Sequence, residues 1–205
     1  MTPARAFGIG PASDPAGRAA LNAPLFRNLM EEMQDDRRRV VLDLGPARPE
    51  TVALLGRYRC RLDIADLADG LDALNGATEP EAMRAALSAS LPRPRAEATS
   101  VVLCWDLLNY LERPALRAVM GEILGRLGPG ALAHALIAYS TPRMPVRPAR
   151  IVPIEDHRLW VVPATGEEKA APRYSPDELA RCMPGYIVER AMLLKNGMQE
   201  FLFRH

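Results

Sequence analysis

Residues 39–45 read Arg-Val-Val-Leu-Asp-Leu-Gly, a short β-branched and aliphatic run that ends at a glycine followed by a proline. Consecutive apolar residues over this length are typical of a strand that is covered on both faces of a sheet. Residues 59–64 and 100–105 repeat the pattern, and residues 131–139 add another apolar run. These four segments predict the strands of a mostly parallel sheet.

Helical patterns alternate with these strands. Residues 24–39 carry apolar side chains at three- and four-residue spacing, and helix-type stretches at residues 50–58, 80–89 and 114–127 follow the strands. Strands and helices in alternation indicate βαβ units with right-handed crossovers. We therefore expect an α/β fold with a Rossmann-like, mostly parallel sheet and helices on both of its faces.

The chain changes character after residue 140. Residues 141–148 contain three prolines and are expected to lie outside regular structure, whereas residues 150–163 carry two β-rich pieces and predict a hairpin. Together they suggest an insertion at about residues 141–173. Ser175-Pro-Asp-Glu178 has the pattern of a capping box and predicts a helix that runs to about Met183.

Two β-type runs close the sequence. Residues 186–194 and 198–204 are joined by Lys195-Asn196-Gly197, and Asn-Gly is a strong signal for a tight turn. The sheet should therefore end in a C-terminal antiparallel β-hairpin.

The composition indicates a soluble globular protein. The 205 residues include 26 basic and 25 acidic side chains, and this near balance gives no reason to expect nucleic acid as a partner. Cys60, Cys104 and Cys182 lack the spacing of a zinc site or a disulfide framework, so we expect no metal and a cytoplasmic location. Residues 1–23, rich in Pro, Gly and Ala, predict a flexible arm, and residues 24–205 a single domain with no membrane span.

This order of elements resembles the class I S-adenosylmethionine-dependent methyltransferase family. Residues 40–45 are similar to its first motif, a strand that ends in an acidic residue, one spacer and a glycine. Residues 61–65 resemble its second strand, and residues 100–111 and 127–130 resemble its fourth strand and the entry to its fifth. The resemblance covers about residues 24–139 and 174–205.

The resemblance implies a protein that binds S-adenosylmethionine and transfers its methyl group to a protein or small-molecule acceptor. Ligands of open α/β sheets bind at the carboxyl ends of the strands. The candidate cofactor-binding residues are Asp43, Gly45, Ala47, Arg48, Asp63, Asp66, Cys104, Trp105 and Asp106. In the resemblance Asp63 holds the ribose hydroxyls, with Asp66 as the second choice, and Asn109 and Tyr110 face the acceptor.

The sequence departs from the family's pattern at two places. Gly45 is followed by Pro46-Ala47-Arg48-Pro49 where the family has a second glycine, and the prolines remove backbone N–H donors. No third strand is identified between Asp66 and Thr99. The alternative hypothesis is therefore a methyltransferase-like scaffold without cofactor binding. Its N-terminal arm and helix and its insertion would contact a protein partner or a second copy of the chain.

Structural roles compete with functional ones at several residues. Asp43 could instead be a carboxylate at a strand end that accepts hydrogen bonds from the following backbone N–H groups. Asn109 could instead be an amide that binds backbone groups at the start of a helix. His134 lies within an apolar run and is expected to be a hydrogen-bonded histidine of the core. Residues 35–39 are expected to form a solvated helix end.

Overall fold

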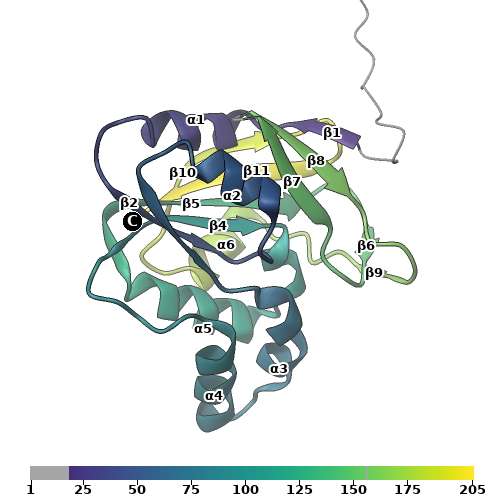
Figure 1. Cartoon of the computed structure of the whole chain (residues 1–205). Helices are drawn as coiled ribbons and strands as arrows, with labels where there is room; N and C mark the ends of the chain where they lie inside the picture. The colour runs from purple at the N-terminus through teal and green to yellow at the C-terminus, as the bar shows by residue number, and fades with distance from the viewer. Residues whose placement is uncertain (1–18, 156) are drawn as a thin grey trace, which may run out of the picture.

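The computed structural model describes residues 19–155 and 157–205 and has a central six-stranded sheet (Figure 1). The strand order is β10-β11-β5-β4-β2-β3. The strands are β2 (Arg39–Asp43), β3 (Cys60–Ile64), β4 (Thr99–Trp105), β5 (Leu127–Ala138), β10 (Ile187–Leu193) and β11 (Met198–Arg204). β2 to β5 are parallel, while β11 is antiparallel to β5 and β10. The predicted α/β sheet and its C-terminal hairpin are confirmed.

Different layers cover the two faces of this sheet. One face carries α1 (Pro24–Glu32), α2 (Pro49–Leu55) and a three-stranded sheet of β1 (Ala19–Asn22), β8 (Arg158–Val162) and β7 (Arg150–Glu155). The other carries α3 (Leu71–Gly76), α4 (Pro80–Ser90), α5 (Arg113–Leu124) and α6 (Pro176–Cys182). Two short 3-10 helices, η1 (Leu67–Gly70) and η2 (Leu107–Tyr110), follow β3 and β4.

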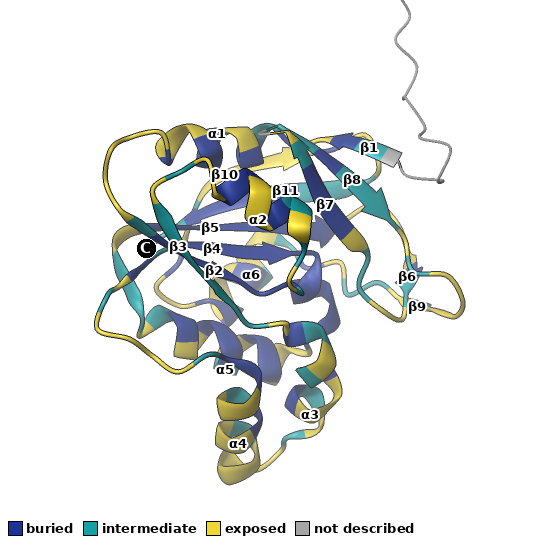
Figure 2. Cartoon of the chain, in the orientation of Figure 1, coloured by how far each residue is buried: buried dark blue, intermediate teal, exposed yellow. Residues whose placement is uncertain are grey.

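The core has two parts because side chains alternate across a strand. Leu42 and Val102 pack under α3 to α6, whereas Val41 and Leu103 pack under α1, α2 and the small sheet. Figure 2 shows the buried residues gathered in β2, β4 and β5 and on the helix sides that face them. None of the helices in the described ranges has the length and apolar character needed to cross a bilayer.

Part of the segment predicted as a flexible arm belongs to the folded domain. Residues 1–18 lie outside the described residues, but Ala19–Asn22 form β1, which pairs antiparallel with β8, and Leu21 is buried. The Ala23 N–H donates to the His157 carbonyl oxygen at 2.9 Å. The start of the domain is thus fastened to the insertion, a long-range pairing that local composition does not reveal.

Two strand boundaries also differ from the prediction. Residues 141–148 contain β6 (Arg143–Pro145), which pairs with β9 (Glu168–Ala170); Pro145 is tolerated because this two-stranded sheet has free edges. β5 begins at Leu127 rather than at residue 131, since Gly128-Pro129-Gly130 forms an irregularity inside the strand, with Gly130 at φ +73°.

Residues 65–98, all of them described, form no strand. η1, α3 and α4 fill this stretch, and β3 is left as the edge of the sheet. The chain therefore lacks the third strand that the resemblance would place between β3 and β4.

Candidate functional site

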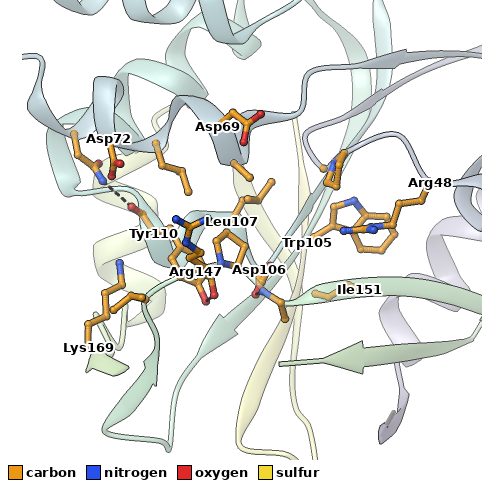
Figure 3. Close-up of a pocket in the computed structure, with 18 of the residues that line it drawn as sticks. Arg48, Asp69, Asp72, Trp105, Asp106, Leu107, Tyr110, Arg147, Ile151 and Lys169 are labelled. Carbon is orange, nitrogen blue, oxygen red and sulfur yellow. Dashed lines mark hydrogen bonds between the residues drawn. The ribbon is translucent and has the colours of Figure 1, made fainter. Parts of the chain in front are cut away.

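A cleft of about 570 Å³ opens at the carboxyl ends of β2 and β4 (Figure 3). The chain leaves β2 toward β3 on one side and returns to β4 on the other, so the strand order reverses here, where open α/β sheets bind ligands. Arg48 and Trp105 lie at one end of the cleft, and Tyr110, Asp72 and Lys169 at the other.

Asp43, Gly45 and Trp105 form one unit at the end of β2. The Oδ1 atom of Asp43 accepts hydrogen bonds from the Gly45 N–H at 2.9 Å and from the Trp105 indole N–H at 2.6 Å. Burial raises the pKa of Asp43 to about 6, although both hydrogen bonds act to lower it. Asp43 does not line the cleft, but it fixes the turn that does. This is the structural role that the sequence suggested for Asp43, a carboxylate that binds the following backbone N–H groups.

The indole also explains why residue 45 is a glycine. A Cβ at this position would lie 2.9 Å from Cδ1 of Trp105, closer than real contacts allow. Trp105 itself has φ +50°, a left-handed conformation that non-glycine residues rarely adopt. The glycine is therefore required by a neighbouring side chain of this chain.

Arg48 lines the cleft, whereas Ala47 is exposed and is not among the lining residues. Arg48 is also the extended residue that precedes α2, which begins with Pro49. Partial burial and the nearby guanidinium of Arg150 lower the pKa of Arg48. The guanidinium thus stands beside a turn in which two prolines supply no N–H donor.

The two ribose candidates, Asp63 and Asp66, are not among the side chains that line the cleft. Asp63 pairs with Arg61 of the same strand at 3.1 Å, and Asp66 is exposed at φ +46°. The lining carboxylates on this side are instead Asp69 of η1 and Asp72 of α3. Their three-residue spacing after β3 is a helical signal that sequence reasoning missed.

Asp106, directly after β4, lines the cleft and is buried. Its Oδ2 atom accepts a hydrogen bond from the Ala149 N–H at 2.9 Å, and burial raises its pKa to about 6. Tyr110 also lines the cleft, and its hydroxyl donates to the Arg147 carbonyl oxygen at 2.8 Å. Both side chains therefore tie the insertion to the end of β4.

Asn109 and Cys104 lie apart from this cleft. The Asn109 amide donates to the carbonyl oxygens of Asp106 and Leu136 and accepts from the Ala138 N–H, each at 2.8 Å. This is the backbone-binding role expected of a helix-entry amide. Cys104 is fully buried in the core, and burial raises the pKa of its thiol to about 12.

The insertion supplies two cationic residues that sequence reasoning missed. Arg147 and Lys169 line the cleft, and the Lys169 ammonium lies 4.7 Å from the centre of the Tyr110 ring. No local signal marks them, because only the pairing of β6 with β9 brings these two parts of the insertion together.

His134 is a core residue, as predicted. Its Nε2 atom lies 2.8 Å from Oε1 of Glu200, and both side chains have no exposed surface. Glu200 also accepts from the N–H groups of Leu25 and Phe26, so its carboxylate caps the first turn of α1. The pair joins α1 to β5 and β11.

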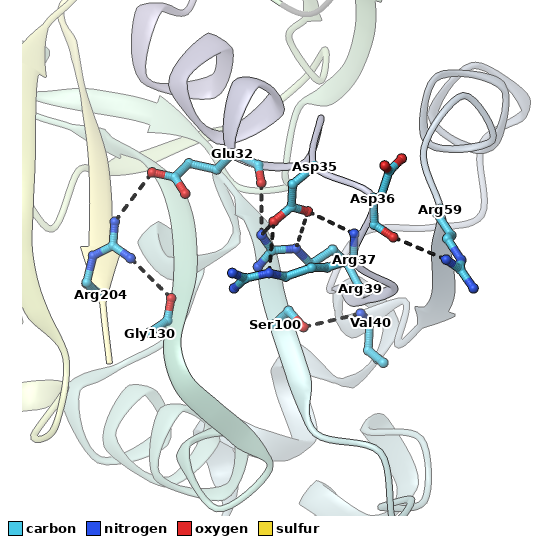
Figure 4. A network of polar contacts seen from close by, with 10 residues as sticks. All are labelled: Glu32, Asp35, Asp36, Arg37, Arg39, Val40, Arg59, Ser100, Gly130 and Arg204. Atoms are coloured by element: carbon cyan, nitrogen blue, oxygen red, sulfur yellow. Dashed lines mark hydrogen bonds and ion pairs between the residues drawn. The ribbon is translucent and has the colours of Figure 1, made fainter.

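The charged residues after α1 lie at the amino end of β2, opposite the cleft (Figure 4). Arg39 donates to the Asp35 carboxylate at 2.7 Å and to the Glu32 carbonyl oxygen at 3.0 Å, and Arg37 is mostly exposed. The helix predicted over residues 24–39 thus ends at Glu32, and residues 35–38 form an exposed loop instead of a helix end. Arg39, the first residue of β2, joins this loop and the end of α1 to the sheet.

Comparisons with known proteins support the fold. No protein-family model and no curated protein matches the sequence. A 1,6-didemethyltoxoflavin-N1-methyltransferase from Burkholderia thailandensis, solved with 1,6-didemethyltoxoflavin and S-adenosylhomocysteine, is 16% identical with a TM-score of 0.50, over 88% of this chain and 76% of that one. The N-methyltransferase NodS from Bradyrhizobium japonicum WM9 is 12% identical with a TM-score of 0.50, over 89% of this chain and 94% of that one. The chain therefore has the Rossmann-like fold of the class I S-adenosylmethionine-dependent methyltransferases.

Proposed function

We propose that the chain binds S-adenosylmethionine in the cleft and transfers its methyl group to a small-molecule acceptor. The observation that carries this proposal is the cleft itself, at the point where the strand order reverses. Its volume of about 570 Å³ lies within the usual range of small-molecule sites.

The side chains of the cleft match the chemical groups of the cofactor. Arg48 offers a guanidinium to the methionine carboxylate in place of the missing N–H donors. Asp69 and Asp72 offer carboxylate oxygens to the ribose hydroxyls, and Leu71 and Leu107 offer apolar surface to the adenine ring. The residues present therefore fit the cofactor.

The bound cofactor supplies a methyl group that is already activated by its sulfonium sulfur. The work left to the protein is to hold an acceptor in line at near-attack distance, which accounts for a large part of the rate in such reactions. Asp43 keeps the turn at Gly45 in place, and Asp106 and Tyr110 keep the insertion closed over the cleft.

Calorimetric titration with S-adenosylhomocysteine tests the proposal. The wild-type protein should bind one equivalent, Asp69→Ala should weaken binding by about tenfold or more through the lost charge-assisted hydrogen bonds, and Asp63→Ala is the matched control. The reverse order of the two variants would return the ribose role to Asp63. No binding to the wild type at millimolar ligand would overturn the proposal.

One observation favours the alternative, a scaffold without cofactor binding. The Trp105 indole lies against Gly45, where the resemblance puts the methionine part of the cofactor. If the indole blocks the site, Trp105→Ala should bind S-adenosylhomocysteine while the wild type does not. The insertion and the N-terminal segment would then be the first places to search for a protein partner or a second copy.

A further inference from the structure

A second cavity of about 320 Å³ lies next to the cleft. Asp106, Tyr110 and Ala149 line both cavities, so the two spaces share a wall. Leu21 of β1 and Val161 of β8 also line the second cavity. The pairing of β1 with β8 and the folding of the insertion thus build a compartment directly beside the proposed cofactor site.

The lining of this cavity is mainly apolar. Its apolar lining residues include Leu21, Ala138, Met144, Val161 and Met198. The volume lies at the lower end of the range for small-molecule sites, which suits a compact ligand.

The polar groups of the lining are largely engaged within the chain. The Asn109 amide makes three hydrogen bonds to backbone, and the Tyr110 hydroxyl donates to Arg147. Arg143, which is exposed, pairs with Glu168 at 3.2 Å. Among the described residues that line this cavity, Asp106 is the one carboxylate. An anionic ligand would therefore meet an acid and an arginine that is already paired.

We propose that this second cavity is the acceptor site and that it takes a compact, largely apolar, uncharged molecule whose N–H or O–H group meets the Asp106 carboxylate. This inference rests on the proposed function, because it makes the neighbouring cleft the source of the methyl group. It narrows the small-molecule acceptor of that proposal to one chemical class.

Asp106 also gives the transfer a proton acceptor. The acceptor's nitrogen or oxygen forms its new bond to the methyl carbon as the carbon–sulfur bond breaks, and the sulfur keeps that electron pair. The proton released from the acceptor passes to the Asp106 carboxylate. The step is balanced without a further reactant.

Binding of prodan, an uncharged naphthalene dye, tests the cavity directly. We expect a blue-shifted, saturable fluorescence with the wild-type protein, and binding weaker by at least about tenfold in Met198→Trp, whose larger side chain fills the space. Met192→Trp is the matched control, because Met192 lies on the partner strand of the same hairpin, is 41% exposed and does not line the cavity. The anionic dye 8-anilinonaphthalene-1-sulfonate should bind more weakly than prodan at the same site.

Four results would overturn the inference. Equal prodan binding by Met198→Trp and wild type would show that the dye binds elsewhere, and tighter binding of the anionic dye in a Met198-dependent manner would refute the uncharged class. 2-Naphthol carries an O–H group that naphthalene lacks, so it should displace prodan at lower concentration than naphthalene does. If it does not, or if the difference between the two compounds is the same in Asp106→Asn as in the wild type, the role assigned to Asp106 is refuted.

S-adenosylhomocysteine titrations of the same variants separate this inference from the proposed function. Unchanged affinity in Met198→Trp together with lost prodan binding supports two adjoining sites and shows that the variant is folded. Prodan binding in a protein that binds no S-adenosylhomocysteine would refute the proposed function and the acceptor assignment, while the cavity would remain a site for apolar ligands.

Discussion

Replacing Asp43 by Asn should remove a step in the pH dependence of stability. Burial raises the pKa of Asp43 from 3.8 to about 6 in the folded protein. Between these values the folded state binds more protons than the unfolded state, so the free energy of unfolding falls as the pH rises from about 4 to about 6 and is level above that. A shift of this size corresponds to about 3 kcal/mol. Asn retains an oxygen acceptor for the Gly45 and Trp105 donors but carries no charge.

Urea unfolding followed by tryptophan fluorescence at pH 4, 6 and 8 measures this effect. Relative to wild type, Asp43→Asn should gain roughly 2–3 kcal/mol of stability between pH 4 and pH 8. Asp36→Asn, which removes an exposed carboxylate, controls for the change in net charge. A constant difference between Asp43→Asn and wild type across this range, or a difference of the opposite sign, would refute the reasoning.

Three further substitutions test the packing around the site by the same urea titrations. Glu200→Gln should lower the free energy of unfolding by about 1–3 kcal/mol, because an amide NH2 group replaces one of the two buried carboxylate oxygens that accept from the N–H groups of Leu25 and Phe26. Asn109→Ala should cost about 2–3 kcal/mol, since buried backbone groups lose their partners. Ser175→Ala should cost about 1 kcal/mol through loss of the capping box with Glu178. Losses below about 0.5 kcal/mol for the first two, the range of ordinary surface changes, would contradict these assignments.

The sequence predicted the parallel sheet and its terminal hairpin because their signals are local. Apolar runs, the Asn196-Gly197 turn and the capping box at Ser175 each depend on residues close together in the chain, and all three are present in the structure. The three-stranded sheet of β1, β8 and β7 was predicted only as the hairpin of β7 and β8. Its strand β1 was missed because β1 and β8 are about 140 residues apart and their pairing leaves no local pattern.

The candidate site was predicted in part for the same reason. Gly45, Arg48, Trp105 and Asp106 were found because they lie at the carboxyl ends of β2 and β4 or in the turn after β2, and these residues line the cleft. Asp69 was missed because it stands on η1, a turn further along the chain than the strand end that the resemblance favours. Arg147 and Lys169 were missed because they belong to the insertion, and only the pairing of β6 with β9 brings its two parts together beside the cleft.

The central claim is that the cleft at the ends of β2 and β4 holds the cofactor, and thermal unfolding with S-adenosylhomocysteine tests it most directly. Ligand at 100 times its dissociation constant stabilises the folded state by about 2.7 kcal/mol. For a domain of this size the midpoint should rise by roughly 5–11 °C. The account predicts such a rise, and a smaller one in Asp69→Ala. An unchanged midpoint at millimolar ligand would contradict it.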